Sequence, residues 1–183
     1  MPVTPRNEHR VSLYLRTCFW VSTKSVLRMR TIESLLDEYG DSHRNPTNKL
    51  VHWICVPVIF FSIVGLLYSV KLGGLMLTPS LPLNLAMVTL SLLLVYYIRL
   101  SPTLAAGMAL FALICLFLWQ QLENSGATLW QVSLVLFVLA WIGQFWGHKV
   151  EGKKPSFLKD LQFLLIGPAW LMSFLYQRAG IAI

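Results

Sequence analysis

The chain has 183 residues, of which 56% are hydrophobic and only 13% are charged, with a formal net charge of +7. A soluble domain carries roughly 25% charged residues, and a globule of this size cannot bury so large an apolar excess. The composition therefore predicts one membrane-embedded domain and argues against two soluble ones.

The first 28 residues differ from the rest of the chain. They mix Arg, Ser and Thr with a short apolar patch that Arg16 interrupts, which makes the patch too short for a membrane span or a good signal peptide. We expect 1–28 to be an N-terminal extension, poorly ordered or bound to a surface. We expect 29–183 to form the single membrane-embedded catalytic domain.

A short amphipathic helix is predicted over 31–41, ending at Gly40 and Asp41. Such a helix is typical of a membrane surface. Its apolar side would be Ile32, Leu35, Leu36 and Tyr39. Asn45 and Pro46 then predict a turn that starts a new helix, with Asn45 as its cap.

Long uncharged runs predict the membrane spans, each of which needs roughly 20 residues. The runs are 51–70, 83–99, 103–119, 130–147 and 161–176. The fifth run contains Gly167-Pro168, which predicts a kinked span or a re-entrant pair of half-helices. The predicted fold class is therefore all-α: a polytopic membrane helix bundle with four to five spans and a short N-terminal surface helix.

The basic residues alternate between the two sides of this bundle. Eight of the fifteen Lys and Arg residues precede residue 51 and four lie between the fourth and fifth runs, whereas the loops at 71–82 and 120–129 hold one and none. This bias predicts a cytoplasmic N-terminus. Because the basic residues flank apolar runs, they favour contact with membrane lipid over nucleic-acid binding. We expect an integral membrane protein of the bacterial inner membrane or the endoplasmic reticulum.

Three histidines and one glutamate stand at the ends of these runs. His43 and His52 lie at the start of the first run, and His148 and Glu151 follow the fourth. Four crossings return the chain to its starting side, so all four groups are expected on the cytoplasmic face. Three imidazoles and one carboxylate suit a divalent transition metal such as iron.

The spacing of these residues places them on helix faces. Asn48 and His52 are four apart, and Gln144, His148 and Glu151 are spaced four and three, so each set shares one face. If both faces turn inward, the two polar stripes meet at one end of the bundle, as in metal-binding helix bundles. From spacing alone, interfacial histidines and an ordinary surface ion pair of Glu151 remain the alternative.

Two stretches surround these residues. The first is YGDSHRNPTNKLVH, from Tyr39 to His52, and the second is WIGQFWGHKVEGKKP, from Trp141 to Pro155. Both resemble the small membrane family of 2-hydroxy fatty acid dioxygenases. The resemblance covers about 31–178 and contains both motifs in order. It leaves 1–28 outside.

This resemblance implies an Fe(II)-dependent enzyme that uses molecular oxygen in fatty-acid alpha-oxidation. The enzyme would cleave the C1–C2 bond of a long-chain 2-hydroxy fatty acid and release an acid one carbon shorter. The matching positions imply metal-binding and catalytic roles for His43, His52, His148 and Glu151, together with Asn48. A site of two histidines and one carboxylate is the common pattern for such iron, so three histidines leave open a His-rich site, one non-ligating His, or two metals.

Other residues around the motifs are candidates for supporting roles. Asn48 and Gln144 are expected to orient a ligand, and Lys49, Arg44 and Lys153 are candidates to attract the substrate carboxylate. Lysines near span ends commonly extend toward the interface without binding a ligand.

Two other classes of function fit the same residues. The first is a membrane-embedded zinc hydrolase of a lipid, because metal-bound water needs similar ligands. The second is a non-enzymatic membrane scaffold whose polar stripes stabilise helix packing. The sequence predicts neither the oligomeric state nor the chain length of the substrate.

Overall fold

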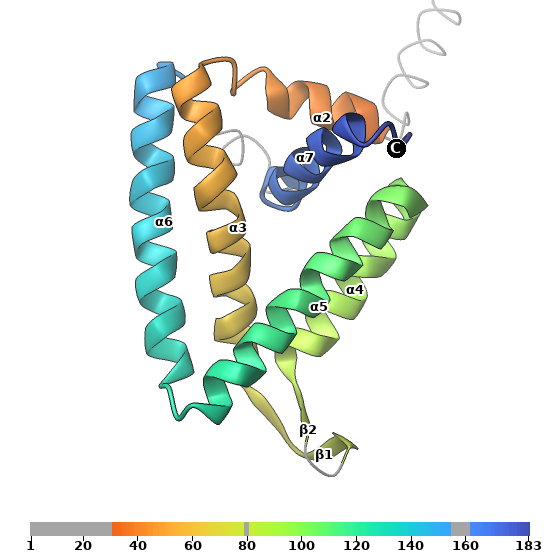
Figure 1. The fold of residues 1–183 in the computed structure, drawn as a ribbon, viewed down its shortest axis with the longest axis vertical. Helices are drawn as coiled ribbons and strands as arrows, with labels where there is room; N and C mark the ends of the chain where they lie inside the picture. Colours follow the sequence, from red (N-terminus) through yellow and green to blue (C-terminus); the bar gives the residue numbers. More distant parts are fainter. Residues whose placement is uncertain (1–30, 79–80, 155–161) are drawn as a thin grey trace, which may run out of the picture. The chain divides into compact units, whose positions relative to one another are not determined.

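The computed structural model describes residues 31–78, 81–154 and 162–183, so the expected extension 1–28 lies outside the described residues. The unit Ile32–Ile183 is compact and is helical apart from one hairpin (Figure 1). Its elements are α2 (Ile32–Gly40), α3 (Pro46–Tyr68), β1 (Lys71–Thr78), β2 (Leu81–Asn84), α4 (Leu85–Leu100), α5 (Pro102–Asn124), α6 (Leu129–Glu151) and α7 (Gln162–Arg178).

Three of these helices are long and apolar enough to cross a membrane. They are α3, α5 and α6, and each has 23 residues. This confirms long apolar helices at the predicted runs 51–70, 103–119 and 130–147. α4 is also apolar but has only 16 residues, so the expected total of four to five spans stays a prediction.

The helix starts follow from capping residues. The Asn45 side chain accepts a hydrogen bond from the Thr47 N–H (2.8 Å), which confirms the predicted start of α3. Ser101 ends α4 and also caps α5, where its hydroxyl accepts from the Leu104 N–H (3.2 Å). Because one residue joins the two helices, α4 and α5 run antiparallel as neighbours (Figure 1).

Small residues let α3 and α6 lie side by side (Figure 1). A Cβ atom at Gly143 would lie 2.6 Å from the Cys55 sulfur, and one at Gly147 would lie 2.5 Å from Asn48 Oδ1. Both distances are shorter than van der Waals contact, so only glycine fits. Small residues four apart are a common basis for close helix packing in membranes.

The segment between α3 and α4 differs from the prediction. The sequence indicated a loop at 71–82, whereas the structure contains an antiparallel hairpin of β1 and β2. The pairing satisfies backbone N–H and C=O groups that a loop would leave to solvent. The segment lacks the alternation of polar and apolar residues that would have predicted strands.

α7 is one continuous helix that contains Pro168, so the predicted pair of half-helices is not observed. It packs against α2 and α3 in an apolar cluster made of Leu35, Tyr39, Val56, Phe163, Ile166, Trp170 and Leu171. The Tyr97 hydroxyl donates to the Leu165 carbonyl (2.7 Å), and the Tyr176 hydroxyl donates to the Thr103 carbonyl (2.8 Å). α7 is therefore fixed to α2, α4 and α5; a complete crossing of the membrane by this helix stays a prediction.

The junction of α3, α5 and α6 provides a test of the packing. A Cβ atom at Gly65 would overlap the ring of Trp119 and the hydroxyl of Ser133, both of which are fully buried. We expect Gly65→Ala to lower the free energy of unfolding by about 1–3 kcal/mol because the site is already filled. Thermal unfolding in detergent measures the effect. Gly73→Ala is the control, because nothing lies within 4 Å of its Cβ position; equal stability of both variants would contradict the close packing.

Candidate metal centre

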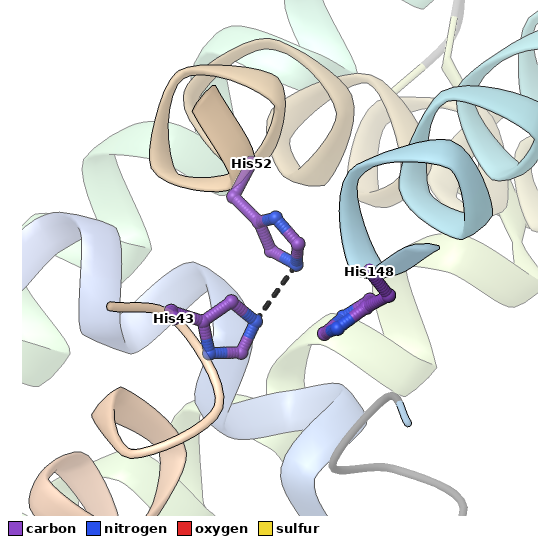
Figure 2. Close-up of side chains that lie close together, drawn as sticks. All are labelled: His43, His52 and His148. Carbon is purple, nitrogen blue, oxygen red and sulfur yellow. Dashed lines mark hydrogen bonds between the residues drawn. The ribbon is translucent and has the colours of Figure 1, made fainter. Parts of the chain in front are cut away.

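Three histidines from three elements come together at one end of the bundle. His43 lies in the turn after α2, His52 in the second turn of α3 and His148 in the last turn of α6, and Figure 2 shows the three rings around one common space. Their exposed fractions are 1%, 1% and 5%. One ring nitrogen of each lies within 4.8 Å of the others, so this buried group could bind a metal ion.

Hydrogen bonds to backbone carbonyls fix two of the rings. His43 Nδ1 lies 2.6 Å from the Tyr39 carbonyl oxygen, and His52 Nδ1 lies 2.9 Å from the Asn48 carbonyl oxygen. A carbonyl oxygen only accepts, so each Nδ1 carries the hydrogen and each Nε2 keeps a lone pair. Backbone hydrogen bonds of this kind orient metal-binding imidazoles.

The two lone pairs face each other. His43 Nε2 and His52 Nε2 are 2.8 Å apart, the contact drawn as a dashed line in Figure 2. It can be a hydrogen bond only if one ring gains an additional proton. Burial lowers the pKa of His43 to about 4, against the raising effect of its bond to Tyr39, so the neutral ring dominates near pH 7. A metal cation resolves the repulsion of the two lone pairs.

The third ring supports the same interpretation. His148 Nδ1 is buried and has no hydrogen-bonding partner among the described residues. The ring centroid of His148 lies 5.0 Å from that of His43 and 4.9 Å from that of His52. Buried polar atoms without a partner are rare, so this end of the bundle has the donor set that a transition metal requires.

Two aromatic side chains hold His43 in place. The Tyr39 ring stacks on the imidazole with centroids 4.2 Å apart and planes 17° apart, and the Trp170 ring lies 5.2 Å away. Tyr39 was predicted on the apolar side of the first helix and at the start of the first motif, without a role at the site, and no role was predicted for Trp170. The four-residue spacing of Tyr39 and His43 was the only sequence feature that could have predicted either contact with His43. Trp170 reaches the site through the packing of α7, which the sequence does not indicate.

Glu151 lies beside the histidines in a different environment. Its Oε1 accepts from the Arg44 N–H (3.0 Å), and its Oε2 accepts from the Asn45 N–H (2.8 Å) and from Asn48 Nδ2 (3.3 Å). These bonds attach the end of α6 to the turn that carries His43. Among the described residues, the cluster of side chains that could bind a metal ion consists of the three histidines and does not include Glu151. The role of Glu151 as a metal ligand therefore stays a prediction.

Asn48 and Gln144 are buried, as the predicted helix faces require. Asn48 Nδ2 also donates to the Ser42 carbonyl (3.3 Å), which adds a second link to the turn before α3. Gln144 lies one helical turn before His148, and both side chains line an apolar cavity that is described below. Asn48 and Gln144 therefore lie close enough to the histidines to orient a metal ligand or a bound substrate.

The three basic candidates lie on the outer side of the site. Arg44 pairs with the exposed Asp41 side chain (2.6 Å), and Lys153 Nζ donates to the Asp41 carbonyl (2.5 Å). Lys49 and Arg44 line a cleft of about 620 Å³ between α2 and α7, which His43 also reaches. Lys153 and Arg44 thus hold the turn around Asp41, whereas the Lys49 side chain makes no hydrogen bond or ion pair with the described residues.

An apolar cavity of about 480 Å³ begins at the histidines. His52, His148 and Gln144 line its head, and side chains of α3, α4 and α7 form its walls. A metal held by the three histidines would face this cavity on one side and the cleft between α2 and α7 on the other. Such a site suits a ligand with a polar head and a long apolar tail.

Comparisons with known proteins agree with this geometry. The family model described as 2-hydroxy-palmitic acid dioxygenase Mpo1-like matches residues 29–179. The chain is 31% identical over 149 residues to the 2-hydroxy-palmitic acid dioxygenase MPO1 of Saccharomyces cerevisiae, with 80% of each chain covered. No solved structure matches the chain.

Metal titration separates a ligand from a group that positions ligands. We expect His52→Ala to abolish stable metal binding, whereas Glu151→Ala should weaken affinity by about 10–100-fold, the usual effect of losing a group that orients a ligand. Metal content after dialysis against graded chelator measures both. Lys149→Ala, an exposed change on the same helix turn as His148, is the control. Equal and complete metal loss in the Glu151 and His52 variants would make Glu151 a ligand.

Proposed function

Because the chain belongs to the 2-hydroxy-palmitic acid dioxygenase Mpo1-like family, we propose that it is an Fe(II)-dependent membrane dioxygenase of fatty-acid alpha-oxidation. It takes a long-chain 2-hydroxy fatty acid and molecular oxygen, cleaves the C1–C2 bond and releases an acid one carbon shorter. Residues 29–183 form the single catalytic domain, and 1–28 precede it.

One observation carries this proposal: three buried imidazoles converge, and two of them, His52 and His148, line the head of an apolar cavity. His43, His52 and His148 would hold the iron, which when bound supplies Lewis acidity and one-electron chemistry with oxygen. The neutral state of His43 suits this role, since only a neutral imidazole can donate its lone pair. A His-rich site with open positions is compatible with iron, and the comparison with a dioxygenase favours iron over zinc.

The surrounding residues perform the remaining tasks. The carbonyls of Tyr39 and Asn48 orient two imidazoles through their Nδ1 hydrogens, and Glu151 holds the turn that carries His43. Gln144 lines the cavity head, where its amide would donate a hydrogen bond to the carboxylate or the 2-hydroxyl of the substrate. Lys49, on the outer side of His43, attracts the carboxylate. Together these contacts hold C1 and C2 beside the metal position.

The membrane arrangement follows from the same convergence. Because His52 and His148 lie together, their convergence supports an even number of crossings between them, and we infer that α4 crosses the membrane as well as α3, α5 and α6. At about 1.5 Å per residue, α4 is about 24 Å long, somewhat short of the roughly 30 Å hydrocarbon core. The hairpin before α4 and local thinning of the bilayer make up the difference. The basic loops favour a metal centre on the cytoplasmic face.

Anaerobic purification followed by metal analysis and substrate turnover tests the function. We expect the protein to retain iron and, on addition of 2-hydroxypalmitate and air, to consume oxygen and form pentadecanoate. His148→Ala should abolish both iron retention and product because it removes one of three ligands. Oxygen consumption and product mass measure the reaction.

One control variant and two alternative outcomes make this result specific. Leu139→Ala, at a position exposed on the outer face of α6, should leave iron and turnover unchanged. A protein that retains zinc and hydrolyses a lipid without oxygen would instead support the membrane hydrolase. A metal-free protein that leaves 2-hydroxypalmitate intact, with a normal fold, would contradict the dioxygenase.

Cysteine labelling in oriented vesicles tests the even number of crossings. In a background without the native cysteines, we expect Arg44→Cys and Lys154→Cys to react with a membrane-impermeant maleimide from the same side. Asn124→Cys, at the end of α5 where the hairpin also lies, should react from the opposite side. Labelling of positions 44 and 154 from opposite sides would refute the proposed arrangement.

A further inference from the structure

We infer that the cavity below the histidines holds the acyl chain of the substrate as a molecular ruler, with its floor at Val64, Leu67 and Leu90. Side chains one turn apart on α3 then set the chain length that the protein accepts. This inference rests on the proposed function for the identity of the substrate. It adds the position of the tail and the residues that select it.

The length of the cavity fits an acyl chain. Its wall on α3 extends from His52 at the head to Leu67, a separation of 15 residues, or about 22 Å at about 1.5 Å per residue. One leaflet of a bilayer has a hydrocarbon layer of about 15 Å, half of the roughly 30 Å core. The cavity therefore has room for one extended chain of the length found in membrane lipids, together with its head.

The polarity of the cavity gives the chain a direction. His52, His148 and Gln144 lie at the head, whereas the lower wall on α3 consists of apolar side chains, among them Ile59, Phe60 and Ile63. A carboxylate in the lower part would lose its hydration without compensation. The carboxylate and the 2-hydroxyl therefore lie at the histidines, and the methyl end points toward the hairpin.

Packing between α3 and α4 closes the lower end. Val64, Tyr68, Ala86 and Leu90 belong to one buried cluster with Trp119, and Figure 1 shows α3 and α4 diverging from this junction near the hairpin. α7 lies across the wider part, and its residues 163–168 contribute to the cavity wall. The cavity is thus a wedge between α3 and α4 with a closed narrow end, as a ruler requires.

One side of the wedge opens toward lipid. Leu92 lines the cavity from α4, yet its side chain is 68% exposed. Thr89, one turn earlier, also lines the cavity and is exposed. A fatty acid in the bilayer can therefore move its tail sideways past α4 while its carboxylate stays at the membrane face, so the charged head need not cross hydrocarbon.

Two substitutions on α3 test the ruler. Leu67→Phe fills the floor, and Ile63→Phe fills the cavity one turn higher; both positions are half-buried. We expect Leu67→Phe to raise the ratio of kcat/KM for 2-hydroxylaurate over 2-hydroxypalmitate by about tenfold, and Ile63→Phe to raise it further. Ile54→Phe is the matched control, because Ile54 lies on α3, is 61% exposed and does not line the cavity. Iron content should stay at the level of the unmodified protein in all three.

Photo-crosslinking gives a second measurement that does not need turnover. A palmitate probe with a diazirine at the methyl end should label peptides containing Ile63–Leu67 or 89–93, and Leu67→Phe should reduce that labelling. Labelling at these positions in a protein without dioxygenase activity would support the ruler and refute the proposed function. Active protein whose chain-length preference is the same in both Phe variants as in Ile54→Phe would refute the ruler alone. If Leu67→Phe does not fold, Thr89→Trp fills the same region from the exposed side of α4.

Discussion

The close contact of α3 and α6 is the constraint on which the rest of the structure depends. Gly143 and Gly147 bring the two backbones together, and Asn48 fits against the second of them. This contact sets His52 and His148 at the same height, one on each helix. Their rings are then buried between the helices. Wider spacing of the helices would separate the rings and admit water.

Much of this arrangement could be predicted from residue spacing. Two pairs of polar residues are each one helical turn apart: Asn48 with His52, and Gln144 with His148. The number of apolar runs between these two pairs predicts that both pairs lie at the same end of the bundle. The position of His43 could be predicted less directly, because it lies in a turn and a turn has no periodic pattern of side chains. The Glu151 contacts could not be predicted, because its partners are backbone N–H groups of Arg44 and Asn45, and any residue at those positions would offer the same donors.

The parts that sequence analysis missed depend on how separate elements pack. Trp170 contacts His43 only because α7 folds back over α2, and the hydropathy of 161–176 describes a span equally well. The cavity is likewise a property of two helices that diverge, α3 and α4, so neither helix alone indicates it. The hairpin of β1 and β2 lacks alternating polarity in its sequence, so the pattern that identifies most strands is absent there.

The distribution of the three histidines along the chain has a consequence for biogenesis. His43 and His52 leave the ribosome early, whereas His148 follows only after three further helices, so the ion cannot be captured while translation of that region is incomplete. Metal binding by the three histidines is then a late event that joins an early and a late part of the assembled domain. A limited supply of the metal would act on the finished protein and leave its synthesis unaffected.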